Sequence, residues 1–320
     1  MWLVALAPMI AGLTVASKRV AVPQTGIGVR ESSHTFHCNT ALDAPNVWQL
    51  QMPSAALEQA KLIFDEAIRP HCTQATLAQL EKQTIPCNGW HTEHGDYFIM
   101  KAGSSTDAKL AWTSDLAWIS VDDQRSFDIF SKIFDNLHVR EAIAPLVDTH
   151  ERVRLYSSFF VVRSRCAKAN LHTDWDNSVG TNAFTLLTPL ADYPSADFQL
   201  LYEDFATTMG RGNAQAASGT AADESQLRQY RYKKGEAIVF ASHFYHSTEP
   251  GSSVEVDGAP HVYLCFTFGT DKQEIYERTI APTISGYQSR ILVDAAGDMQ
   301  LTELGRYLAA DPDGHFRCPR

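Results

Sequence analysis

Residues 154–165 read RLYSSFFVVRSR, a run of apolar, aromatic and β-branched residues that is typical of a β-strand. Four further runs of this kind follow, with turn residues between them: AFTLLTPL (183–190), FQLLYED (198–204), EAIVFAS (236–242) and HVYLCFTFG (261–269). No helical period lies between these runs, which disfavours parallel crossovers. The second half of the chain is therefore predicted to form an antiparallel sandwich or barrel.

The chain before residue 150 has a different character and is predicted to be mixed and helix-rich. SAALEQAKLIFDEAIRPHC (54–72) begins with a cap-type serine, spaces its apolar residues helically and ends at Pro70. SFDIFSKIFDNLHVREAIAPLVD (126–148) is the longest helical region, and ATLAQLEKQ (75–83) is a short one. Strands are expected at YFIMKAG (97–103) and AWISVD (117–122), whereas residues 20–53 lack periodicity and indicate irregular structure.

The composition is ordinary for a soluble globular protein, with 44% hydrophobic and 20% charged residues among 320. Lys and Arg number 27 against 37 Asp and Glu, which gives a net charge of −10. Because no basic block could follow a phosphate backbone, nucleic acid is excluded as an expected partner. No internal stretch reaches the length of a stable membrane span. The oligomeric state cannot be read from the sequence.

The first 20 residues, MWLVALAPMIAGLTVASKRV, are largely apolar before Lys18 and Arg19. The apolar stretch within residues 1–17 has the length of a signal-peptide core. However, the region before this stretch has no basic residue, and the chain has no Asn-x-Ser/Thr sequon. Two readings stay open. The segment is either a secretory or organellar targeting signal, or a buried N-terminal element of a cytoplasmic protein.

A short polar motif follows the first strand of the β-rich half. NLHTDWDNSVG (170–180) places His172 and Asp174 two residues apart, and alternate residues of an extended backbone project to one side. An H-x-D pair taken alone is more often a polar turn than a metal site. A metal site therefore requires a third donor from another strand.

The run KKGEAIVFASHFYHSTEPG (233–251) supplies that donor, because His246 follows its strand just before Pro250. His172, Asp174 and His246 would form the two-histidine, one-carboxylate set that binds non-haem Fe(II) and leaves coordination positions open. His243 is the rival third ligand and is less favoured. HTEHGD (91–96) holds four possible ligands but lacks helical zinc spacing, so a polar loop is expected there.

These motifs resemble the 2-oxoglutarate and Fe(II)-dependent dioxygenases, in particular the group that is similar to prolyl hydroxylases. The resemblance covers Arg154 to Thr270 and lies in LHTDWD, GEAIVFASHFYHSTEP and VYLCFTFG. It implies an α+β, mainly β fold, a double-stranded β-helix of the jelly-roll or cupin-like type with supporting N-terminal helices. The expected parts are a possible targeting segment (1–17), a helix-rich part (18–150), the oxygenase core (151–280) and a C-terminal extension (281–320).

The sequence departs from this family where the cosubstrate is expected to bind. The resemblance implies an Arg or Lys on the strand after the second histidine, because a guanidinium binds a carboxylate through paired hydrogen bonds. That strand carries His261 at the expected position instead. Arg163 or Arg165, on the strand before the H-x-D, could supply the charge from across the barrel. The alternative for both arginines is a solvated strand edge.

The resemblance implies Fe(II), 2-oxoglutarate and O2 as cofactor and cosubstrates, and oxidation of a substrate C–H bond coupled to formation of succinate and CO2. Asp174 favours hydroxylation or desaturation over halogenation, because halogenating relatives carry a small residue there. The substrate is expected to be a small molecule or a peptidyl group. Residues beside the ligands either line its pocket or only pack: Trp175, Asp176, Tyr202 and Tyr245.

Two other functions stay open on the same barrel. The first is a non-catalytic binding module whose metal is absent or structural, which the missing strand Arg or Lys supports. The second is a cupin-type iron oxygenase that does not use 2-oxoglutarate. The sequence has no G-x-S-x-G, P-loop or complete G-x-G-x-x-G motif, so hydrolase, NTPase and nicotinamide-dependent functions have no support.

Overall fold

The computed structural model describes residues 42–71, 89–101, 114–193, 197–210, 227–252, 260–287, 291–293 and 299–301. All of them belong to one compact unit, Phe36–Arg320. The possible targeting segment, the predicted helix at 75–83 and most of the C-terminal extension lie outside the described residues. Within the described part, no helix is both long and apolar enough to cross a membrane.

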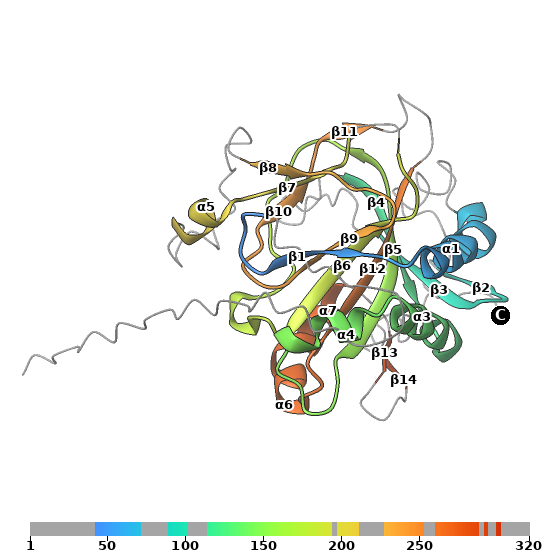
Figure 1. Ribbon diagram of the computed structural model, residues 1–320. Helices are drawn as coiled ribbons and strands as arrows, with labels where there is room; N and C mark the ends of the chain where they lie inside the picture. The colour runs from blue at the N-terminus through green and yellow to red at the C-terminus, as the bar shows by residue number, and fades with distance from the viewer. Residues whose placement is uncertain are drawn as a thin grey trace, which may run out of the picture. The chain divides into compact units, whose positions relative to one another are not determined.

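A large antiparallel sheet dominates the described residues (Figure 1). Its main path runs through eight strands in the order β1 (Val47–Gln51), β9 (Glu236–Phe240), β6 (Ala183–Pro189), β12 (His261–Gly269), β5 (Arg154–Cys166), β4 (Ser114–Val121), β3 (Gly95–Lys101) and β2 (Gly89–Thr92). The short strand β11 (Gly251–Ser252) pairs with the end of β5. The fold is thus mostly β with few helices, and the strand runs predicted from residue 154 onward are confirmed.

A second, three-stranded sheet consists of β10 (His246–Thr248), β7 (Leu200–Tyr202) and β8 (Arg228–Tyr230), in that order. An isolated antiparallel bridge between His172 and His246 adds the segment before β6 to its edge. A separate pair, β13 (Ile291–Val293) and β14 (Met299–Leu301), forms near the C-terminus. The small sheet therefore combines segments from both predicted metal-ligand motifs.

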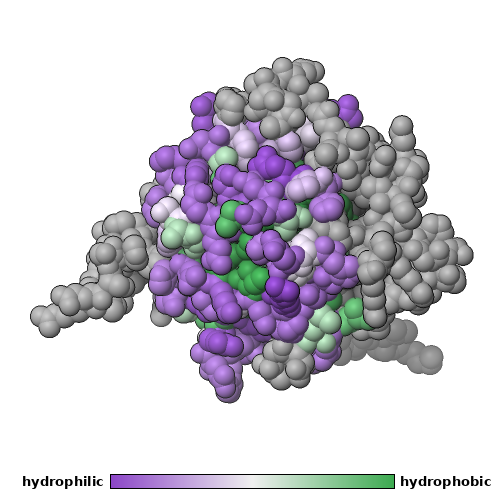
Figure 2. All heavy atoms as spheres, turned by 90° about the vertical axis from the view of Figure 1, so that its right-hand side faces the viewer, coloured by the Kyte–Doolittle hydropathy of each residue, from purple (hydrophilic) through white to green (hydrophobic). Residues whose placement is uncertain are grey.

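The helices are short, and the two longest, α1 and α3, belong to the first half of the chain. α1 (Ser54–Ile63) continues into a π-helical turn, and α3 (Gln124–Asn136) is followed by α4 (Val139–Ile143). The others are α5 (Phe205–Gly210), α6 (Gln273–Ile275) and α7 (Ala281–Tyr287). Figure 2 shows the side on which α1 and α3 lie in Figure 1, where mostly hydrophilic residues surround a small hydrophobic patch. A hydrophilic outer surface is expected of amphipathic helices whose apolar faces are buried, as those of α1 and α3 are.

The two faces of the large sheet pack against different partners. Along β12, Val262, Leu264 and Phe266 belong to the apolar core that includes α1 and α3. Tyr263 and Cys265 point to the opposite face and join a second core, which includes Leu200, Tyr202 and Tyr230 of the small sheet. Because strand residues alternate between faces, one strand serves both cores. The small sheet thus covers the face that the helices leave open.

Three local predictions are wrong in detail. Residues 20–53 were expected to be irregular, but Val47–Gln51 form β1 and pair along the whole length of β9. The helical region 126–148 is broken at His138, whose φ of 54° is left-handed and incompatible with a continuous helix. Ser54 is the first residue of α1 and not its cap, since Pro53 holds the N-cap position without a side-chain hydrogen bond.

Candidate metal centre

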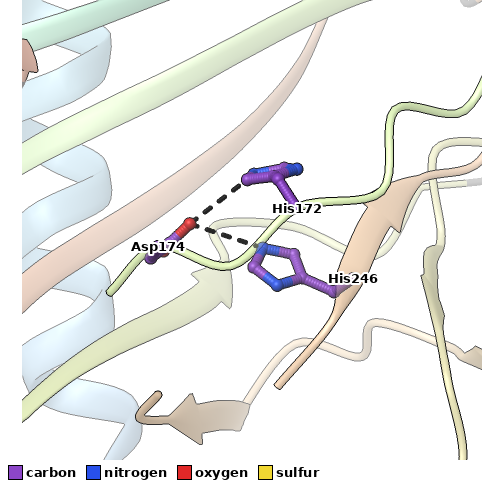
Figure 3. Close-up of side chains that lie close together, drawn as sticks. All are labelled: His172, Asp174 and His246. Carbon is purple, nitrogen blue, oxygen red and sulfur yellow. Dashed lines mark ion pairs between the residues drawn. The ribbon is translucent and has the colours of Figure 1, made fainter. Parts of the chain in front are cut away.

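The structure brings His172, Asp174 and His246 together (Figure 3). Asp174 Oδ1 lies 3.6 Å from His172 Nε2 and 3.6 Å from His246 Nε2. One potential ligand atom from each residue lies within 4.8 Å of the others. The His246 side chain is 8% exposed, whereas that of His172 is 40% exposed, so the group is closed on one side and open on the other.

Backbone pairing holds the two histidines side by side. The His172 amide donates to the His246 carbonyl at 2.9 Å, and the His246 amide donates to the His172 carbonyl at 2.9 Å. The Asn170 amide also donates to Ser247 Oγ at 2.6 Å. Because β10 is in turn paired with β7, the small sheet fixes the distance between residues that are 74 positions apart in the sequence.

Both imidazoles use their Nδ1 atoms in the same way. His172 Nδ1 lies 2.8 Å from the Asn170 carbonyl oxygen, and His246 Nδ1 lies 3.1 Å from the Phe244 carbonyl oxygen. A carbonyl can only accept, so Nδ1 carries the proton and Nε2 keeps its lone pair. Both Nε2 atoms point toward Asp174 (Figure 3). This is the tautomer and the orientation that a metal ligand requires.

The environment of His246 disfavours its charged form. Burial lowers the pKa of His246 to about 4, with smaller contributions from His172 and Arg163, against the opposing influence of Asp174. The imidazole is therefore neutral near pH 7. A metal would find a deprotonated nitrogen without having to displace a proton.

Trp175, the neighbour of Asp174, is anchored to the large sheet. Its Nε1 donates to Thr185 Oγ1 of β6 at 3.1 Å, and its side chain is 1% exposed. Tyr156, Val179 and Tyr276 belong to the same apolar cluster. Trp175 thus has the surroundings of a packed residue. This agrees with the expectation that some residues beside the ligands only pack and do not line the pocket.

His243, the rival third ligand, lies away from the three residues. Its φ of 67° places it in a left-handed turn after β9, and its influence helps to lower the pKa of Asp176 after that of the Ser178 hydrogen bonds. Among the described residues one further group has metal-ligand chemistry: Glu66 of the π-helical turn after α1, with Glu93 and His94 of the turn between β2 and β3. Glu66 and Glu93 are exposed. The predicted polar loop 91–96 is the tip of the β2–β3 hairpin, whose strands include four of its six residues.

No family model and no curated protein matches this sequence. Similar solved structures include HygX from Streptomyces hygroscopicus with nickel and 2-oxoglutarate bound, at 11% identity and a TM-score of 0.42, covering 71% of this chain and 84% of HygX. The non-heme alpha-ketoglutarate-dependent carbocyclase SnoK from nogalamycin biosynthesis is 10% identical with a TM-score of 0.43, covering 72% and 81%. EvdO2 from Micromonospora carbonacea var. aurantiaca is 12% identical with a TM-score of 0.43, covering 71% and 86%.

Arg163 is a buried cation of the kind expected to bind the carboxylate of the cosubstrate. It extends the row of Phe159 and Val161 on the inner face of β5 and is 9% exposed. Its Nε and Nη1 atoms are buried and have no hydrogen-bond partner among the described residues. Its Cζ lies 5.5 Å from the centre of the Tyr263 ring. Two buried guanidinium nitrogens without an acceptor are costly, so this position fits an anionic ligand.

Cys265 connects this cation to the metal group. The thiol is fully buried, and burial raises its pKa. Two charges act on it in opposite senses: Arg163 lowers the pKa and Asp174 raises it. Cys265 therefore lies within electrostatic reach of both.

The two other predicted anchors lie in different surroundings. His261 is Arg163's cross-strand neighbour on β12 and is fully buried. The ring of Tyr193 stacks on its imidazole at 4.0 Å, and Phe198 meets it edge-on at 4.9 Å. Arg165 is exposed at the end of β5, as expected for the solvated alternative. Of the three residues, Arg163 is the one whose charge acts on His246.

Of the remaining predicted pocket residues, Asp176 is exposed, whereas Tyr202 and Tyr245 are buried. Asp176 is exposed and caps the turn Asn177–Val179, where its Oδ1 accepts from the Ser178 amide at 2.8 Å. Tyr202 is His246's cross-strand neighbour, and its ring lies 5.7 Å from that of Phe244. Tyr245 is 8% exposed, and its carbonyl accepts from the Glu203 amide at 3.0 Å.

Sequence reasoning missed Tyr230 and Tyr232, whose hydroxyl groups are buried in the same interior. The available signal was the alternation in RQYRYKKG (228–235), which sends both aromatic rings to one side of an extended segment.

Proposed function

We propose that this chain is an Fe(II)- and 2-oxoglutarate-dependent dioxygenase. The observation that carries the proposal is the pairing of two features in one interior: the His172, Asp174 and His246 donor set, and the buried guanidinium of Arg163, whose Nε and Nη1 atoms have no hydrogen-bond partner among the described residues. Two imidazole nitrogens and one carboxylate suit ferrous iron and leave positions for further ligands.

The strand order supports a double-stranded β-helix. β5, β12, β6 and β9 are adjacent in the large sheet, and the His172 segment, β10, β7 and β8 are adjacent opposite them. Following the chain from β5 onward, the segments alternate between the two sheets, except that β7 and β8 follow one another in the small sheet and β11 and β12 in the large one. This alternation is the winding of a jelly-roll barrel. The proposed core is residues 151–280. Strands β1 to β4 of the proposed 18–150 part widen the large sheet, and its helices cover the outer face.

Each protein group has a defined task in the proposed reaction. His172, Asp174 and His246 would hold the metal, and Arg163 would bind the far carboxylate of 2-oxoglutarate. When bound, iron and 2-oxoglutarate supply the oxidative decarboxylation that drives hydroxylation or desaturation of a substrate C–H bond. Asp174 occupies the position that a halide would need. The apolar surroundings of Arg163 exclude water, which strengthens its attraction for a carboxylate.

The open side of the metal group is the proposed approach for a small-molecule or peptidyl substrate. His172 is the most exposed of the three ligands, so the substrate would approach from its side. Asp176, at the exposed turn after Asp174, and Tyr202 and Tyr245, beside His246 in the small sheet, are the proposed contacts. Trp175 is left out of this set because it packs beneath Asp174.

One titration tests the proposal. The protein is purified anaerobically, loaded with Fe(II) and titrated with 2-oxoglutarate while the metal-to-ligand charge-transfer band is monitored. A saturable band is expected, and succinate should form slowly when O2 is admitted. Bound iron without a band would indicate a cupin-type oxygenase independent of 2-oxoglutarate. Failure to bind iron would indicate a non-catalytic binding module.

A further inference from the structure

A row of four side chains crosses the small sheet, starting at the metal group. An isolated bridge pairs His172 with His246, and the cross-strand neighbour of His246 is Tyr202 on β7. Tyr202 is in turn paired with Arg228, the first residue of β8. Directly opposite residues of antiparallel strands share a face, and the strands lie about 4.8 Å apart, so the Arg228 backbone is about 10 Å from that of His246. The row thus leads from the candidate metal centre to a charged side chain.

The row ends in an ion-pair cluster that carries more negative than positive charge. Arg228 Nη2 lies 3.1 Å from Asp43 Oδ2 and 3.3 Å from Asp204 Oδ2, and the Arg228 side chain is 48% exposed. Hydrogen bonds from Thr207, followed by the charge of Arg228, lower the pKa of Asp204, so this carboxylate is ionised at neutral pH. Two carboxylates and one guanidinium leave a net negative charge that solvent can reach. The cluster therefore attracts a cation more strongly than an anion.

The phenol of Tyr202 lies beside this cluster. Tyr202 is 4% exposed, and its hydroxyl forms no hydrogen bond with any residue that the structure describes. Burial raises the pKa of Tyr202, Arg228 lowers it, and Asp43 and Asp204 raise it, so the hydroxyl lies within electrostatic reach of all three charges. An unpaired hydroxyl on a buried side chain is unfavourable, which makes the phenol available to a ligand that reaches the cluster.

We propose that the carboxylates of Asp43 and Asp204 and the hydroxyl oxygen of Tyr202 bind a cationic amino group of the substrate. The C–H bond to be oxidised then lies at the metal, about 10 Å from that amino group. The inference rests on the proposed function for the oxidation itself. An ammonium group has three N–H donors, and the two carboxylates and the phenol oxygen offer three acceptors. The Tyr202 ring, between the metal ligand and Arg228 in the row, gives an apolar surface for the carbon chain that joins the amino group to the reacting carbon.

The test measures the binding of two probes of equal chain length, hexylammonium and hexanoate, to the metal-free protein by ligand-observed NMR titration. The wild type should bind hexylammonium and not hexanoate. The double variant Asp43→Asn/Asp204→Asn should raise the hexylammonium Kd about tenfold, because both negative charges are removed while asparagine still caps α5. Arg228→Met should lower that Kd severalfold, because the cation that competes for the two carboxylates is removed.

Asp128→Asn is the matched control, because it removes the same charge from α3, which packs on the other face of the large sheet. It should bind hexylammonium as the wild type does. Hexanoate binding that Arg228→Met abolishes would identify an anion site and overturn the assignment. Absence of hexylammonium binding, or an unchanged Kd in the double aspartate variant, overturns it as well.

A second measurement relates the bound amino group to the metal and separates this inference from the proposed function. The protein is loaded with Mn(II), whose unpaired electrons broaden nearby proton signals. The terminal methyl signal of hexylammonium should broaden more than that of the methylene beside its nitrogen. Equal or reversed broadening overturns the assignment as a substrate site. If the protein binds no metal, the proposed function fails, and the titration of the metal-free protein alone decides the cation site.

Discussion

At the scale of single residues, the candidate metal centre is organised before a metal binds. Each histidine donates from Nδ1 to the carbonyl oxygen two residues earlier, so both imidazoles have the same tautomer and similar support. The carboxylate of Asp174 stands between the two free nitrogens. The sequence could predict these three residues from spacing, but not the tautomers, because the hydrogen bonds depend on the backbone path.

The first prediction separates the two candidate third ligands. His246→Ala should abolish stoichiometric iron binding, because only two of the three donors remain. His243→Ala is the matched control, since it removes a histidine three residues away, and it should bind iron as the wild type does. Iron content after anaerobic loading and desalting gives the answer. Loss of iron in His243→Ala with retention in His246→Ala would refute the assignment.

The second prediction concerns the opposing effects of Arg163 on binding and on stability. Arg163→Met should weaken 2-oxoglutarate at least a hundredfold, because the charged hydrogen bonds are lost, while iron binding is retained. It should also raise the free energy of unfolding of the ligand-free protein by about 1–4 kcal/mol, since a buried charge without an ion-pair partner among the described residues is replaced by an apolar side chain.

Arg165→Met serves as the control for Arg163→Met, because Arg165 is exposed at the end of the same strand. It should change neither the 2-oxoglutarate Kd nor the urea midpoint. If Arg163→Met lowered stability and left cosubstrate binding intact, Arg163 would be a structural residue.

The third prediction follows from the lowered pKa of His246. The folded pKa is about 4, against about 6.5 in the unfolded chain, so on acidification the unfolded state takes up the proton first. This contribution to stability is fully present above about pH 6.5 and is lost as the pH falls toward 4. Urea unfolding of the metal-free protein should therefore show a steeper loss between pH 7 and pH 5 in the wild type than in His246→Gln. Parallel losses would contradict the shift.

At the scale of elements, the position of a strand in the sequence is easier to predict than the strand with which it pairs. β5, β6, β9 and β12 were predicted because their apolar runs are continuous, as expected when both faces of a sheet are buried. β1 was missed because its five residues gain their stability from pairing with β9, a contact that no local pattern records. The break at His138 was missed for a similar reason, since the residues on both sides are apolar at helical spacing.

The fourth prediction tests the link between β6 and the ligand segment. Trp175→Phe removes the hydrogen bond from Nε1 to Thr185 Oγ1, and Thr185→Val removes the acceptor. Each variant should destabilise the protein by about 1–3 kcal/mol, and the double variant should lose about 1 kcal/mol less than the sum. Because Asp174 is the adjacent residue, each should also weaken iron binding severalfold. Additive losses of stability would show that the two side chains do not interact.

At the scale of the whole molecule, the candidate site lies where the two sheets meet. His246 belongs to the small sheet, whereas Asp174 is held through Trp175 to the large one. The fold class could be predicted from the strand runs and the motifs. The surroundings of Arg163 could not, because sheet packing buries it against Tyr263, and the local sequence fitted a solvated strand edge equally well.

The last prediction uses this position between the sheets. A metal that binds the folded protein alone stabilises it by RT ln(1 + [M]/Kd), or about 2.7 kcal/mol at a hundredfold excess over Kd. Added Ni(II), a redox-inert substitute for Fe(II), should therefore raise the melting temperature by a few degrees, and a chelator should reverse the rise. Asp174→Asn keeps the size of the side chain but removes the charge that links the metal to the large sheet, so it should lose most of the rise. His243→Ala should keep it. If Asp174→Asn were stabilised as strongly as the wild type, the two histidines alone would hold the metal, and the bridge between the sheets would not exist.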